Sequence, residues 1–177
     1  MDSMNKNTEA IIIKEAIPSE AGQLITYVHA LTDERDIYIA LSSCEFKLNL
    51  VEERQILEKY TSSENSIFLV AEFEGKITGS LNCPGGSRKA IRHSARLGMS
   101  VSKVWRDQGV GSLLLEFAIQ WARGNPVISR TELNVFVENT AAIHLFSEVG
   151  FQIEGTRRTS IFRDGRYHDD HLMAILL

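Results

Sequence analysis

The stretch "VWRDQGVGSLLLEFAIQWA", residues 104–122, decides the fold prediction, because it joins a pair of glycines to a long amphipathic run. Gly109 and Gly111 stand two residues apart, and the apolar residues after them recur at helical spacing. The segment before it, "ARLGMSVSKVW" (95–105), is typical of a strand with a glycine in its interior. We therefore expect a strand, a glycine turn and a helix that runs from about Gly109 to Arg123.

A strand that leads into such a turn and helix can hold an anion. The N–H groups of the first helical turn point outward, the helix dipole adds about half a positive charge, and glycine lets phosphate oxygens approach the backbone. The candidate amides run from Arg106 to Ser112. The alternative is that Gly109 and Gly111 only allow tight packing of the helix, and a single G-x-G pattern does not decide between the two.

Two other phosphate-binding motifs do not fit this turn. A P-loop needs a lysine and a hydroxyl residue after its last glycine, whereas Ser112 follows Gly111 with no lysine between them. A dinucleotide fingerprint needs a third glycine at position 114, which is Leu114. A Rossmann-type oxidoreductase is therefore kept only as a third interpretation, to be tested by whether NAD raises the melting temperature.

Patterns along the rest of the chain predict one mixed α/β domain over residues 11–177. The expected order is strand, helix, helix, three strands, helix, strand, helix and two strands, with residues 33–50 ambiguous. Hairpin turns are expected at Gly75 and at Asp164-Gly165, and Asn139 and Gly150 suit the two ends of a helix. Residues 1–10 are polar and lack a hydrophobic core segment, which predicts a flexible lead-in and no signal peptide.

Composition narrows the functional classes. A hydrophobic fraction of 44% and a charged fraction of 24% are typical of a soluble globular protein, and a net charge of -4 argues against nucleic acid as a partner. Cys44 and Cys83 lie far apart with no Cys/His cluster, so we expect two reduced thiols and no metal site. The longest apolar run, residues 172–177, is far short of the ~20 residues that span a bilayer. We expect a cytoplasmic protein without a membrane partner.

Two motifs together resemble the GNAT superfamily of acyl-CoA N-acyltransferases. The first is Arg106-x-x-Gly109-x-Gly111 after the strand "LGMSV". The second has the spacing N-x-x-A-x-x-L-[YF]-x-x-x-G-F, which is matched by Asn139, Ala142, Leu145, Phe146, Gly150 and Phe151. The resemblance covers all but the first ten residues. Within the superfamily, the chain is similar to bacterial members that acetylate small amines or amino acids.

The resemblance implies a splayed, mostly antiparallel mixed sheet with helices on both faces, and acetyl-CoA as co-substrate. The pyrophosphate would lie on the glycine turn, and pantetheine would pair with the strand backbone like an added strand. The acceptor would be a primary amine of a small molecule, such as an amino acid or a polyamine, which attacks directly in a ternary complex. The resemblance assigns to the cofactor Met99, Ser100, Val101, Arg106, Asp107, Gln108, Gly109, Val110, Gly111, Ser112, Asn139 and Phe146.

Two residues depart from the family pattern. Arg96 stands where similar enzymes often carry a glutamate base, and Phe146 stands where they often carry a tyrosine acid. Arg96, if it faces the wedge between the splayed strands, would favour an acceptor with a carboxylate. These departures motivate the alternative that the chain binds coenzyme A as a module or sensor without efficient transfer.

Replacement catalytic residues can be proposed from what is left. His93 is a candidate base because its pKa lies near neutrality, and Tyr167 is a candidate acid or acceptor contact. Each could equally be structural, and Glu132 could position a water or lie on a solvated face. His144 is expected at the surface. The apolar C-terminal strand is a candidate for pairing across a homodimer interface.

Overall fold

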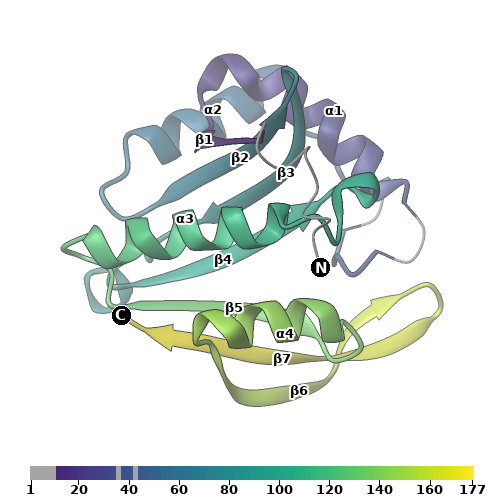
Figure 1. Cartoon of the computed structure of the whole chain (residues 1–177), viewed down its shortest axis with the longest axis vertical. Coiled ribbons are helices and arrows are strands. Elements are labelled where there is room, and N and C mark those ends of the chain that lie inside the picture. The colour runs from purple at the N-terminus through teal and green to yellow at the C-terminus, as the bar shows by residue number, and fades with distance from the viewer. Residues whose placement is uncertain (1–10, 35–36, 42–43) are drawn as a thin grey trace, which may run out of the picture.

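The computed structural model describes residues 11–34, 37–41 and 44–177, and its centre is a seven-stranded sheet in the order β1-β2-β3-β4-β5-β7-β6 (Figure 1). The predicted lead-in over residues 1–10 lies outside the described residues. The strands are β1 (Ile12–Glu15), β2 (Ile67–Phe73), β3 (Lys76–Cys83), β4 (Ser94–Val101), β5 (Arg130–Phe136), β6 (Gln152–Arg163) and β7 (Arg166–Leu176). The helices are α1 (Ala21–Thr32), α2 (Leu50–Thr61), α3 (Val110–Gly124) and α4 (Thr140–Val149), with short 3-10 turns at Pro18–Glu20, Lys89–Ile91 and Lys103–Trp105.

The predicted fold class and order of elements are confirmed: the sheet is mixed and mostly antiparallel, with helices on both faces. The hairpins turn at Gly75 and Gly165, both with positive φ. Asn139 caps α4 by accepting from the Ala142 amide, and Gly150 ends that helix in the left-handed region. Residues 33–34, 37–41 and 44–49, part of the ambiguous segment, contain no helix or strand.

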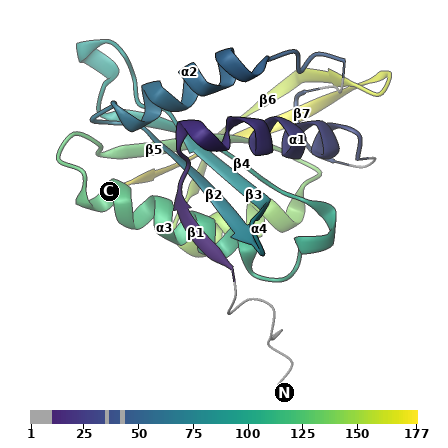
Figure 2. The same cartoon turned by 90° about the horizontal axis from the view of Figure 1, so that it is seen from above.

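Two apolar layers hold the helices against the sheet. α1 and α2 cover one face, where Leu24 and Leu57 pack with Val70 of β2. α3 covers the other face, where Leu114 and Leu115 join a larger core, and α4 lies on this face beside β5 (Figures 1 and 2). Alternate residues of one strand serve opposite layers, as the pleat requires. In the described ranges, no helix has both the length and the apolar content that a membrane crossing needs.

The sheet opens between β4 and β5. These strands pair in parallel only from Ser94↔Arg130 to Leu97↔Leu133, although β4 continues to pair with β3 as far as Gly79↔Val101. β4 and β5 therefore start side by side and diverge toward their C-terminal ends (Figure 1). Since this is the one parallel pair in the described sheet, a doubly wound Rossmann sheet is excluded.

Candidate active site

The glycine turn begins α3 at the open end of β4. Gly109 is the N-cap residue with φ 83°, a left-handed conformation that costs a residue with a Cβ about 1–2 kcal/mol. The Leu113 amide donates to the Gly109 carbonyl and starts the helical ladder, so the amides before it have no partner within the helix. A Cβ at Gly111 would lie 3.3 Å from Leu145 Cδ2 and 3.6 Å from Met99 Cε, so the missing side chain lets the start of α3 pack closely against both residues.

A cavity of about 420 Å³ lies along this turn and the free edge of β4. Nine of the predicted cofactor residues line it: Met99, Ser100, Val101, Arg106, Asp107, Gly109, Gly111, Ser112 and Asn139. The side chain of Val110 does not, because it is fully buried in the core beneath α3. Gln108 is half-buried and donates to the Val104 carbonyl.

Arg106 connects the glycine turn to Glu34, in the segment after α1, through an ion pair. Its Nε donates to the Val101 carbonyl at 3.0 Å, and its Nη2 is paired with Glu34. The other Glu34 oxygen accepts from the Lys103 amide at 2.9 Å. Arg106 therefore holds the glycine turn in shape, a role that the sequence did not reveal because Glu34 lies 72 residues away.

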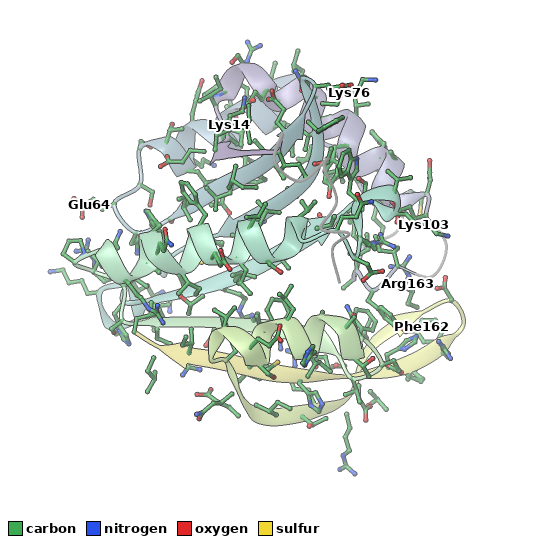
Figure 3. All side chains as sticks on the ribbon, viewed as in Figure 1. Lys14, Glu64, Lys76, Lys103, Phe162 and Arg163 are labelled. Atoms are coloured by element: carbon green, nitrogen blue, oxygen red, sulfur yellow. The ribbon has the colours of Figure 1, made fainter. Side chains whose placement is uncertain are left out.

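A second cavity, of about 650 Å³, lies between α1, α2 and the strands from β2 to β7. Phe146, the last predicted cofactor residue, lines this cavity. Both cavities share Tyr38, Ile39, Met99, Ser100, Asn139 and Ala142, so they meet where β4 leaves β5. Across that opening, Arg163 of β6 donates to the Ile39 carbonyl, and Figure 3 shows Arg163 and Lys103 at the same end of the molecule.

Three hydroxyl groups meet at the junction of the cavities. The Ser100 hydroxyl lies 3.0 Å from the Tyr27 hydroxyl and 3.2 Å from that of Ser80. Burial raises the pKa of Tyr27 to about 12, although the hydrogen bonds to Ser100 and Ser80 oppose the rise. The Tyr27 side chain is therefore neutral at physiological pH. The sequence did not indicate this role for Tyr27, because its position fits the buried side of a helix.

Two polar side chains of the second cavity differ in their hydrogen bonding. Asp170 is fully buried and accepts from Arg157 Nε at 2.8 Å and from the Ser160 hydroxyl at 2.7 Å. Burial pushes the pKa of Asp170 up, but these hydrogen bonds outweigh it, so the pKa is lowered. Asn134 is the first β5 residue beyond the pairing with β4, and its buried Nδ2 has no partner among the described residues.

The predicted catalytic candidates lie outside both cavities. His93 is exposed in the turn before β4, at the end of the strand opposite the glycine turn. Tyr167 is 68% exposed near the β6–β7 turn, and its ring packs against Phe162 with centroids 4.9 Å apart. The structure therefore brings neither residue to the site. His144 lies at the surface, as expected, 3.3 Å from Glu148.

Arg96 is also absent from the lining of both cavities, because its side chain pairs with Glu132 on the exposed surface of the sheet. Burial alone would raise the pKa of Glu132, but hydrogen bonds from Arg96 and Arg130 lower it. The expectation that Arg96 faces the wedge is thus not met, and Arg157 is the arginine of the second cavity. In the described part of the chain, no group of three His, Cys, Asp or Glu side chains is placed to hold a metal ion.

Comparisons with known proteins agree on one family. The model of the acetyltransferase (GNAT) family matches residues 34–151. An L-amino acid N-acetyltransferase of Escherichia coli (strain K12) is 36% identical over 106 residues, which cover 60% of this chain and 65% of that relative's length. The other curated relatives are matched over about half of their length.

Two solved structures extend the similarity. A GNAT-family acetyltransferase from Streptococcus pneumoniae has a TM-score of 0.90 and 35% identity, over 94% of this chain and 99% of that one. A putative acetyltransferase from Salmonella typhimurium, solved with its cofactor acetyl-CoA, has a TM-score of 0.80 and 20% identity, over 95% and 94% of the two chains. The second likeness is one of fold.

Proposed function

The chain belongs to the acetyltransferase (GNAT) family, and from that premise we propose that it transfers the acetyl group of acetyl-CoA to a primary amine of a small molecule. The acceptor is an amino acid, a polyamine or a similar amine, which attacks directly in a ternary complex. The observation that carries the proposal is the opening of the sheet after Leu97 and Leu133, where two cavities meet beside the glycine turn.

The glycine-turn cavity suits acetyl-CoA. The unpaired amides after Gly109 can hold a pyrophosphate, and Gly111, which lines this cavity, has no side chain to keep that group from the backbone. Met99 to Val101 have no β5 partner, so the edge of β4 is open to an extended pantetheine chain. When bound, acetyl-CoA supplies the activated acetyl group.

The chain's own side chains at the junction suit acyl transfer. Such a reaction needs a neutral amine, a donor for the developing oxyanion and a proton for the departing thiolate. Asn134 Nδ2 is buried without a partner among the described residues and can donate to an oxygen in the wedge. The Ser100, Tyr27 and Ser80 hydroxyls can hold and relay a proton there, in place of the absent glutamate and tyrosine.

Release of free thiol from acetyl-CoA tests the proposal across a panel of amines that includes L-amino acids, spermidine and phenethylamine. We expect release that requires an amine, and a higher melting temperature in the presence of coenzyme A. Tight binding of coenzyme A with no turnover on any amine would instead favour a coenzyme A sensor.

A further inference from the structure

Glu53 occupies a position on α2 where an apolar residue is expected. It lies on the same side of the helix as Leu57, one turn later, and that side packs against the sheet. Its residue surface is only 5% exposed. Glu53 also lines the second cavity, as does Ile56 from the same helix. The inward-facing side of α2 therefore presents a carboxylate to the cavity.

This carboxylate lacks the partners that other buried carboxylates of the chain have. Glu20 is paired with Lys14 at 2.9 Å and accepts from the Ile17 amide, and Asp170 is paired with Arg157. No hydrogen-bond donor or cation contacts the Glu53 side chain in the part of the chain that the structure describes. Burial without a partner raises the pKa of Glu53 and is unfavourable for its charge. Such a group is retained at a cost in stability, which points to a ligand as its partner.

The rest of the cavity does not supply a countercharge. Arg157 lines it, but its guanidinium is held by Asp170, so that pair adds no net charge. Most of the other lining residues are apolar, among them Leu24, Leu31, Leu48, Phe68, Phe136 and Ile161. The cavity thus suits a compact cation carried on an apolar skeleton.

We propose that Glu53 binds the acceptor as its ammonium ion, so that the acceptor is a cationic amine on a largely apolar skeleton. This inference rests on the proposed acetyl transfer and assigns the residue that selects the acceptor. Glu53 is a specificity-determining residue in this role: the ammonium ion gives up its proton to solvent through the Ser100, Tyr27 and Ser80 hydroxyls before the neutral amine attacks, and Glu53 takes no part in that transfer.

Steady-state kinetics of phenethylamine acetylation tests the assignment with four proteins: wild type, Glu53→Gln, Glu53→Asp and Glu58→Gln. Glu58 lies on the exposed side of the same helix, so Glu58→Gln makes the same charge change outside the cavity. We expect Glu53→Gln to raise the KM for phenethylamine by roughly 10- to 100-fold, the loss that follows removal of a charge-assisted hydrogen bond. The KM for acetyl-CoA should not change, Glu53→Asp should restore part of the loss, and Glu58→Gln should match wild type.

A neutral isostere separates charge recognition from a general defect of the cavity. The alcohol 2-phenylethanol should inhibit wild type and Glu53→Gln with the same constant, because it carries no cation for Glu53. If Glu53→Gln weakened the binding of phenethylamine and of 2-phenylethanol by the same factor, this inference would be overturned and the proposed function would stand. A KM for phenethylamine within twofold of wild type in Glu53→Gln would have the same consequence. Failure of the wild-type protein to acetylate any amine in the panel would instead remove the proposed function and this inference with it.

Discussion

The guanidinium of Arg96 donates from Nε at 3.2 Å and from Nη2 at 2.7 Å to the same oxygen of Glu132. The two residues are register partners in the short parallel pairing of β4 and β5. Arg96 is therefore committed to a neighbouring strand, on the side of the sheet away from α3. A position that often carries a catalytic carboxylate in similar enzymes here joins the two strands just before they separate.

Arg96→Ala should leave acceptor preference unchanged. Because the side chain lies outside both cavities, the KM values for carboxylated and uncarboxylated amines should change by the same factor. The pair is also 60% exposed on the arginine side, so its loss should lower the free energy of unfolding by about 1 kcal/mol or less. Acetylation of L-phenylalanine and phenethylamine by both proteins measures the first effect, and urea unfolding measures the second. A KM that rises for L-phenylalanine but not for phenethylamine would contradict this prediction and indicate that Arg96 contacts the acceptor.

Substitution in the glycine turn should weaken cofactor use. Gly111→Ala adds a methyl group to the lining of the glycine-turn cavity, beside Leu145 and Met99. We expect a roughly tenfold higher KM for acetyl-CoA with a nearly unchanged kcat, because the change weakens binding of the ground state and of the transition state equally. Gly109→Ala should in addition destabilise the fold by about 1–2 kcal/mol, because of its left-handed backbone. Gly124→Ala is the matched control, since it lies on the same helix with open space around it. If the two glycines only aid packing, their substitution should lower the free energy of unfolding without raising the KM for acetyl-CoA.

The glycine turn and the start of α4 were predictable from sequence because their determinants are local. Gly109 acts through its left-handed backbone and Asn139 through capping, and both effects follow from residue type and spacing. The second cavity depends on contacts between distant segments. Glu53 faces the cavity only because α2 packs across the sheet, and Asp170 is buried only because β6 brings Arg157 beside it. The position of His93 could not be predicted for the same reason, since residue type alone does not place it at the far end of β4.

Asp170 should contribute stability that disappears in acid. Its pKa is lowered in the folded state, so the contribution is complete above the unfolded pKa and is lost as the pH falls through the folded pKa. Asp170→Asn should cost about 1.5–3 kcal/mol at pH 7, the range for hydrogen bonds to charged groups, and less below about pH 4. Urea unfolding from pH 3 to pH 7 measures this difference. Asp164→Asn, at an exposed turn position, should show little cost at either pH. A cost for Asp170→Asn that stays constant with pH would contradict the ionised pair.

Glu53 should have the opposite effect on stability. Burial raises its pKa in the folded state, so the folded protein holds its proton to higher pH than the unfolded chain does. Wild-type stability should therefore fall as the pH rises from the unfolded pKa to the folded pKa, and Glu53→Gln should remove that fall. The slope with pH is the diagnostic quantity, because any cost of burying the new amide is the same at every pH.

The neighbouring groups leave this pH window clear. Tyr60, on the same helix, has a pKa raised to about 12 by burial, and the pKa of Asp170 is lowered, so neither titrates between the unfolded and the folded pKa of Glu53. Melting temperatures across that range should rise for Glu53→Gln relative to wild type as the pH increases, whereas Glu58→Gln should remain parallel to wild type. Saturating phenethylamine should then reduce the wild-type deficit, because an ammonium ion would supply the partner that the buried carboxylate lacks. Parallel pH curves for wild type and Glu53→Gln would mean that Glu53 is already compensated in the free protein.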